Sequence, residues 1–351
     1  MMKKISTMAL GIMTAVILGM LFLAWQGYDS LGSYAAVLKY SLGSTFAIGV
    51  TLERTAIVSM VALAAVITFS SGASNLGMFG QILTGEIIAT FIGVYVPLPG
   101  ILLIPVMLIG GALGGAAVAL LAGLGRKFFG MNEFITTLMF NFILEYFSDF
   151  LVNTSMRDPE MSWPMSKVIA KEGIMPRLFG FIDGSVLFAV VIFIFSFIYW
   201  RNTRLGYEMR INGKNPRFAM FGGCAADSNF LKAMALSGAY NGLAGVLLVI
   251  GSGQQNRFLP GMGQNYADEG LMIAIVANNS VIGVLFYAFI FSMFNTGATG
   301  MQLETSIPLE FITMLIGLTV MSVVALREYS TTFLNNMKAL FENKKLKKEE
   351  K

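Results

Sequence analysis

The chain has 351 residues, of which 56% are hydrophobic and only 13% are charged, and its formal net charge is +4 at pH 7. Soluble domains carry about 25% charged residues, so this composition excludes a soluble enzyme, a disordered protein and a single-anchor receptor with a large ectodomain. At about 35 residues for each membrane-spanning helix and its loop, the length predicts on the order of ten crossings of a bilayer.

The first predicted span is the apolar run at residues 5–25, which follows Lys3 and Lys4. Because the run is long and has no Ala-x-Ala cleavage pattern, we expect an uncleaved first helix rather than a signal peptide. Residues 33–54 are mixed in polarity and predict an amphipathic segment that lies at the membrane surface.

The predicted core helices follow within 55–200 and 231–326. Their apolar segments lie at 55–70, 81–96, 101–125, 134–152, 183–200, 231–251, 270–277, 281–294 and 311–326. Several are shorter than a full span or are interrupted by glycine, notably near 70–80 and 270–283. Such segments in both halves of a chain are typical of transporters, in which irregular backbone reaches the membrane midplane. The sequence therefore predicts an all-α polytopic membrane protein with about ten transmembrane helices, some of them discontinuous.

The basic residues are unevenly distributed between the two sides of the predicted membrane. With a cytoplasmic N-terminus and alternating spans, the inner segments hold 17 of the 24 Lys and Arg residues and the outer segments hold 7. Since Lys and Arg favour the cytoplasmic side, we expect both termini to be cytoplasmic. The basic tail at 327–351 either lies against anionic head groups or is a solvated stop-transfer segment.

Cysteine and histidine restrict the chemistry. Cys224 is the single cysteine and there is no histidine, so an intrachain disulfide and a Cys/His zinc site are excluded. The G-x-x-x-x-G-K-[ST] phosphate loop is also absent, so the chain does not bind ATP by that route. We expect no cofactor, no metal and no catalytic residue, and any work must be driven by a partner or by an ion gradient.

A polar stripe marks the segment at 134–152. Its members recur every four residues, at Thr137, Asn141, Glu145, Asp149 and Asn153. Each step of four drifts by only about 40° around a helix, so the last four form one broad stripe. Carboxylates facing lipid are costly, and no Lys or Arg lies inside a predicted apolar segment to pair with them. The stripe therefore either lines a solute path or forms a polar seam between helices.

Three further polar residues lie near the break at 70–80. Asn75 and Gln81 flank it and can present amides that suit an uncharged polar solute. Glu86 is a lone acid in the next segment, and it either points into the path or is hydrogen-bonded to a neighbouring Ser or Thr.

The predicted inner loop at 201–230 contains a helix start. Asn215 is a good cap and Pro216 loses no hydrogen bond in a first turn, so a short cytoplasmic helix is expected from Pro216. The basic charge of the loop, taken alone, needs no explanation beyond the positive-inside rule.

Two runs in the first half resemble a known family. Residues 132–143, Asn-Glu-Phe-Ile-Thr-Thr-Leu-Met-Phe-Asn-Phe-Ile, resemble the N-E-x-I-x-T-[LI]-M-x-N-[YF]-I run of membrane permeases of ATP-binding-cassette importers for nucleosides and simple sugars, the branched-chain amino acid and ribose permease-like family. Residues 75–81 are similar to the N-I-G-x-E-G-Q break of that family, with Phe79 in place of the usual acid.

Two runs in the second half extend the resemblance. Residues 210–222 are similar to the R-x-x-G-x-N-P-x-A-A-x-x-G segment of the family. Residues 269–274 resemble its D-G-I-A-V-A stretch, and the sequence departs from the family at 278–280, where a proline is usual. The four runs follow the order and spacing of the family from about residue 31 to about residue 325.

The resemblance implies a permease subunit, with a single transmembrane permease domain at 1–326, in a bacterial plasma (inner) membrane. It would work with a second homologous permease or another copy of itself, two cytoplasmic ATPase subunits and an extracytoplasmic solute-binding protein or lipoprotein, within the lipid bilayer and without nucleic acid. In the family, the loop at 201–230 docks on the ATPase. The matching coupling residues here are Arg210, Gly213, Asn215, Pro216, Ala219 and Gly222.

The substrate implied by the resemblance is a nucleoside or a simple sugar, and a flavin or another heterocyclic vitamin is the alternative. The predicted pathway residues are Asn75, Gln81, Glu86, Asn141, Glu145 and Asp149. A proton-coupled secondary transporter that uses the intramembrane carboxylates is the alternative function. A membrane enzyme is disfavoured by the lack of histidine and of a nucleophile elbow.

Overall fold

The computed structural model describes residues 2–178 and 180–326. Helices dominate this part of the chain, and its strands form one short antiparallel pair, β1 (Arg177–Leu178) and β2 (Ile182–Asp183), with Arg177 opposite Asp183. The basic tail predicted at 327–351 lies outside the described residues.

Seven helices in the described residues are long and apolar enough to cross a membrane. They are α3 (Thr45–Ser70), α4 (Met78–Tyr95), α5 (Gly100–Phe129), α6 (Glu133–Asn153), α7 (Gly184–Asn202), α10 (Ala226–Ile250) and α12 (Val281–Thr305). Two shorter apolar helices are Leu10–Trp25, within α1 (Met2–Trp25), and Glu310–Leu326. The prediction of an all-α polytopic membrane protein is confirmed.

The breaks predicted near 70–80 and 270–283 correspond to a connection between two spans and to a short helix. Residues 71–77 separate α3 from α4, and α11 (Gln264–Val276) has only 13 residues. At 1.5 Å per residue, a helix of that length covers about 20 Å, less than the roughly 30 Å of a hydrocarbon core. After α11 the chain turns at Asn278 and Asn279, which have positive φ angles of 51° and 55°, a conformation that Asn tolerates better than most residues.

Residues 33–54 do not form one continuous segment. They are divided between α2 (Ser30–Leu42) and the first turns of α3, which begins at Thr45 behind an N-cap hydrogen bond from Ala47 N to Ser44 Oγ. Glu53 and Arg54, the charged residues at the end of this stretch, lie within α3. In the structure both side chains have partners inside the fold, so the helix continues through them.

The described residues fall into two compact units, the first from residues 2–41 and 294–326 and the second from Leu42–Met293. In the first unit, the Phe22 and Phe311 rings stack at 6.3 Å between α1 and the helix Glu310–Leu326. Lys39 of α2 pairs with Glu304 of α12 at 2.6 Å.

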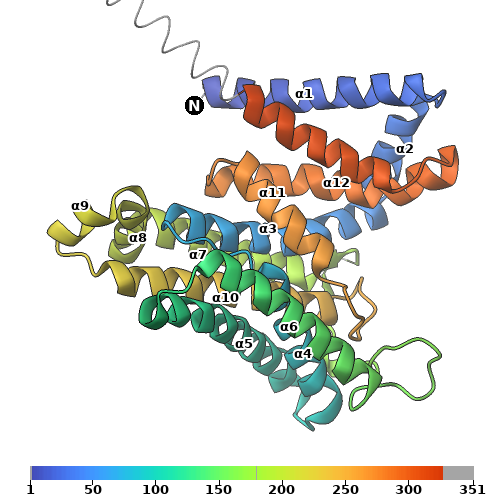
Figure 1. Ribbon diagram of the computed structural model, residues 1–351. Helices are drawn as coiled ribbons and strands as arrows, with labels where there is room; N and C mark the ends of the chain where they lie inside the picture. Colours follow the sequence, from blue (N-terminus) through green and yellow to red (C-terminus); the bar gives the residue numbers. More distant parts are fainter. Residues whose placement is uncertain (1, 179, 327–351) are drawn as a thin grey trace, which may run out of the picture. The chain divides into compact units, whose positions relative to one another are not determined.

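In the second unit, α10 packs against α3, α4 and α5 (Figure 1). Glycines make the closest of these contacts possible. A Cβ on Gly242 of α10 would lie 2.0 Å from the Gly111 carbonyl oxygen of α5, and one on Gly238 would lie 2.3 Å from that of Gly115. Small residues four apart on both helices let the two backbones meet, which is a common device of membrane helices.

Short elements connect the long helices. The loop after α6 contains the 3₁₀ turn η1 (Lys171–Gly173) and the two strands. Between α7 and α10 lie α8 (Arg204–Lys214) and α9 (Pro216–Phe221). The short helix predicted from the Asn-Pro pair is therefore present and begins at Pro216.

Candidate functional site

Buried amides hold the interruption at residues 71–77. Asn75 Nδ2 donates to Gln81 Oε1 at 3.0 Å, and Gln81 Nε2 donates back to Asn75 Oδ1 at 2.9 Å. From α10, Asn241 Nδ2 donates to Gln81 Oε1 at 2.8 Å, and Ser237 Oγ accepts from Asn75 Nδ2 at 2.9 Å. All four side chains are fully buried. The amides predicted to meet a solute therefore pair with one another and with α10 in this structure.

Helix α6 binds the same interruption from its other side. Asn141 Nδ2 donates to the Leu76 carbonyl at 2.9 Å, while Asn141 Oδ1 accepts from Gly80 N at 2.8 Å. The Leu76 N–H donates to Thr137 Oγ1 at 3.2 Å. Both backbone polar groups of Leu76 are thus satisfied by the first members of the α6 stripe. We call Asn75, Gln81, Asn141, Ser237 and Asn241 the amide cluster.

The next members of the stripe, Glu145 and Asp149, lie differently. Both side chains are half-buried, and neither carboxylate has a hydrogen-bond or ion-pair partner among the described residues. Their helix neighbours Ser148 and Asn153 donate to the backbone carbonyls of 145 and 149 instead. Large apolar side chains surround them on the exposed side of α6, namely Phe142, Ile143, Tyr146, Phe147 and Phe150. The first residues of the stripe, Thr137 and Asn141, therefore bind a neighbouring segment of the chain, whereas the carboxylates of Glu145 and Asp149 have no partner among the described residues.

Glu86 is buried in a separate place. Its side chain is fully buried, and neither carboxylate oxygen has a hydrogen-bond partner among the described residues. A Cβ added to Gly263, the N-cap of α11, would lie 2.7 Å from Glu86 Oε1. The acid therefore faces the start of α11, and of the two alternatives for Glu86 the hydrogen bond to a Ser or Thr is not formed among the described residues.

The sequence patterns do not predict the ion pair that joins α3 to α11. Arg54 Nη2 lies 2.5 Å from Glu269 Oε1, and the guanidinium stacks 4.5 Å above the Tyr266 ring. The expectation that no Lys or Arg lies within an apolar segment is therefore wrong for Arg54, which lies half-buried within α3 and pairs with α11 rather than with the α6 stripe. Glu269, the acid at the start of the 269–274 run, is the sequence feature that could have indicated a nearby cation, because a buried carboxylate is costly without a partner.

A cavity of about 250 Å³ lies elsewhere in the same unit, between the start of α3 and residues 177–183. Glu53, Arg177 and Asp183 contribute its charged groups. Glu53 accepts from Gln254 Nε2 at 3.0 Å, and Asp183 accepts from Ser252 N at 2.7 Å. The predicted pathway residues do not line this cavity.

The predicted coupling residues gather in α8 and α9. Asn215 Oδ1 accepts from Phe218 N at 3.0 Å and so caps α9, with Pro216 in its first turn. Ala219 is buried, whereas Phe221 is 93% exposed. Phe218 and Met220 are exposed as well. Helix α9 is therefore short and capped at its N-terminus, ends at the C-cap Gly222, and exposes apolar side chains.

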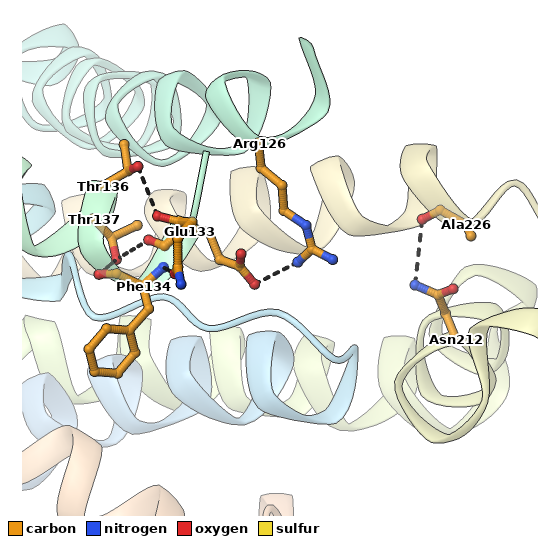
Figure 2. A network of polar contacts seen from close by, with 8 residues as sticks. Arg126, Glu133, Phe134, Thr136, Thr137, Asn212 and Ala226 are labelled. Atoms are coloured by element: carbon orange, nitrogen blue, oxygen red, sulfur yellow. Dashed lines mark hydrogen bonds and ion pairs between the residues drawn. The ribbon is translucent and has the colours of Figure 1, made fainter. Parts of the chain in front are cut away.

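Helix α8 is fastened to its neighbours by polar contacts. Glu208 accepts from Arg204 Nε at 2.7 Å and from Asn229 Nδ2 of α10 at 3.3 Å. These hydrogen bonds lower the pKa of the Glu208 carboxyl below its usual value, and the bond from Arg204 has the larger effect. Asn212 Nδ2 donates to the Ala226 carbonyl at the start of α10, at 3.5 Å (Figure 2). The Arg210 guanidinium lies 5.8 Å from the Trp200 ring of α7.

The start of α6 is fixed by the motif at 132–143. Asn132 Oδ1 accepts from Phe134 N at 2.9 Å and caps the helix. Figure 2 shows Arg126, at the end of α5, reaching the Glu133 carboxylate, with an N–O distance of 2.5 Å. The same guanidinium lies 4.3 Å from the Phe230 ring of α10. This run therefore sets the position of α6, which carries the stripe.

Of the six predicted pathway residues, Asn75, Gln81 and Asn141 meet around the 71–77 interruption. Glu145 and Asp149 lie further along α6, and Glu86 faces α11.

The fold and these sites describe a multi-pass membrane protein with a helix, α11, that is too short to span, a short exposed helix in one loop and acids within its apolar helices. Comparison with protein families agrees with that class. Residues 47–325 match the family model described as the permease component of the branched-chain amino acid transport system. The chain belongs to this family of transport permeases, and the resemblance seen in the four sequence runs is confirmed.

Three relatives match over most of their lengths. The nucleoside ABC transporter permease protein NupB of Lactococcus lactis is 29% identical, over 88% of this chain and 88% of its own. The guanosine ABC transporter permease protein NupP of Bacillus subtilis is 25% identical, over 93% and 95%. The glucose ABC transporter permease protein TsgB13 of Haloferax volcanii is 24% identical, over 91% and 86%. No solved structure gave a significant match.

Family membership and the apolar helices together identify a multi-pass protein of the plasma membrane and an ABC transporter permease of the nucleoside and sugar type.

Proposed function

We propose that this chain forms the translocation pathway of an ABC importer for a small polar solute, a nucleoside or a simple sugar, and is driven by ATPase subunits on separate chains. The observation that carries the proposal is the family match over residues 47–325, together with relatives described as nucleoside, guanosine and glucose permeases. The chain itself contributes a path and a moving part, and no chemical step.

Glu145 and Asp149 are the proposed solute-facing residues. Half-buried carboxylates without partners are expensive against lipid, but they are tolerated where a helix faces water or another protein chain. A second permease subunit, of this sequence or a similar one, would cover the exposed side of α6 and enclose the acids in a shared path. Their oxygens would accept hydrogen bonds from solute hydroxyl or amide groups.

Asn75, Gln81 and Asn141 are proposed to border the path by holding the 71–77 interruption in shape. Their hydrogen bonds to one another and to Leu76 and Gly80 leave few groups for a solute. Glu86, which faces the start of α11, is the sixth proposed pathway residue.

Helix α9 is the proposed docking element for the ATPase. Its exposed apolar side chains suit a hydrophobic groove, and its cap at Asn215 keeps the helix formed when free. An extracytoplasmic solute-binding protein, or lipoprotein, would deliver the solute from the opposite side, with both termini of this chain in the cytoplasm.

The test is to isolate the tagged chain from its own membranes and identify what accompanies it. We expect an ABC-type ATPase, a solute-binding protein and ATP-dependent uptake of labelled guanosine or glucose by vesicles that contain the complex. Riboflavin is the third probe and tests the heterocyclic alternative. Uptake against a gradient by the chain alone, with a proton gradient and no nucleotide, would overturn the proposal in favour of a secondary transporter.

A further inference from the structure

Helix α8 touches the end of α3 through two glycines. A Cβ on Gly213 would lie 2.1 Å from the Ser70 carbonyl oxygen and 2.8 Å from the Gly72 nitrogen. Gly72 has a φ of +75°, and a Cβ there would meet the Gly213 Cα at 3.1 Å. The left-handed φ favours glycine at 72, and the close backbone approach requires it at 213. The two backbones therefore meet with no side chain between them.

This contact lies at the first residues of the 71–77 interruption, and the α6 contact lies at its last. The turn at 71–73 is closed by hydrogen bonds from Ser71 N and Ala73 N to the Thr68 carbonyl. At the other end, both backbone groups of Leu76 bond to side chains of α6. A segment of about five residues thus joins α8 to the stripe that carries Glu145 and Asp149.

We propose that the 71–77 interruption is the link that transmits movement of the docking helix to the pathway helix, with Gly213, Gly72, Thr137 and Asn141 as its positioning residues. The proposal rests on the proposed function, because it assumes that an ATPase moves α8 and α9. Packed backbones cannot be compressed, so displacement of α8 toward α3 pushes residues 70–72. The bonds to Leu76 pass that shift to α6.

The amide cluster gives the link a firm support. Gln81 and Asn75 tie the moving segment to α10 through Ser237 and Asn241, all of them buried. Because these bonds hold residues 71–77 against α10, a displacement of the segment is passed on to α6 and is not lost in a movement away from α10.

The first experiment uses the whole importer complex in vesicles and compares Gly213→Ala with the wild type. The added methyl must displace the Ser70 carbonyl, so we expect ATP hydrolysis to continue while solute imported per ATP falls at least about fivefold, the lower end of typical coupling factors. Gly317→Ala is the matched control, because a Cβ at Gly317 meets nothing within 4 Å, and it should leave the ratio unchanged.

The second experiment changes the α6 end without adding bulk. Thr137→Val removes the hydroxyl that accepts from Leu76 N, whereas Thr137→Ser keeps it. We expect the valine variant to lower import per ATP and the serine variant to keep the wild-type value. In the Gly213→Ala/Thr137→Val double variant the two losses should not multiply, since both cut one link.

The outcomes separate this inference from the proposed function. If the wild-type complex shows no ATP-dependent uptake, the proposed function fails. If the wild type is coupled and both Gly213→Ala and Thr137→Val keep its import per ATP, the link is wrong while the importer stands. Multiplying losses in the double variant would likewise overturn the link. Should Gly213→Ala not reach the membrane, the valine and serine pair decides alone.

Discussion

Glu145 and Asp149 are half-buried acids on α6. One turn apart on α6, they stand among exposed aromatic and aliphatic side chains and have no partner among the described residues. Arg54 and Glu269 show the opposite arrangement, since these two charged groups form an ion pair within the chain. The contrast between the two pairs is the main reason to place solute contact on α6.

Replacing these acids tests their role. We expect Glu145→Leu and Asp149→Leu to lower solute uptake by about 10- to 100-fold, because a hydrogen bond to a charged group contributes roughly 1.5–3 kcal/mol. Assembly with the ATPase should persist, as measured by copurification. Ile194→Leu, an exposed apolar change on α7, is the control. Normal uptake in both acid variants would reduce the stripe to helix packing.

At the scale of elements, the short pieces of the chain are more informative than the long ones. Helix α9 has six residues, and the Asn215 side chain caps its N-terminus. Helix α11 and the 71–77 interruption provide backbone that a continuous span lacks. Glycine contacts pack α10 tightly against α5, so motion is expected at the short elements and not between these two helices.

The α9 cap gives a test of docking. Asn215→Ala should destabilise the helix start by about 1 kcal/mol and lower solute imported per ATP hydrolysed, because a frayed helix transmits less force. Asn215→Asp, which keeps a capping oxygen, should retain most of the coupling. Both ratios are measured in vesicles with the ATPase subunits present, and equal coupling in all three proteins would remove α9 from the mechanism.

At the scale of the whole molecule, orientation in the membrane decides which side each site faces. The basic residues favour cytoplasmic termini, which would put α8 and α9 in the cytoplasm and the loop after α6 outside. Two compact units share the chain, and the predicted pathway and coupling residues all lie within Leu42–Met293.

Cys224 is a natural reporter of this orientation, because it is the single cysteine and lies just after α9, partly exposed. A membrane-impermeant maleimide should fail to label it in intact cells and should label it after permeabilisation. In a Cys224→Ser background, Trp163→Cys in the loop after α6, where Trp163 is 71% exposed, should label from outside. The reverse pattern would invert the topology.

The sequence by itself determined the class, the order of the spans and the family. Apolar runs long enough to cross a bilayer predict membrane helices directly. The four motif runs and the Asn-Pro cap are read from neighbouring residues, so they need no tertiary structure to be recognised. The cap at Asn215 and the start of α6 at Glu133 are set within a few residues of chain.

Only the tertiary structure decided which polar groups are paired. Arg54 ends the predicted surface segment, because its partner, Glu269, is 215 positions away and a local pattern does not show it. Asn75 and Gln81 were expected to face a solute, yet they bond to each other and to α10. Hydrogen bonds and ion pairs depend on distances between helices, and those distances arise from glycine contacts that a linear pattern does not encode.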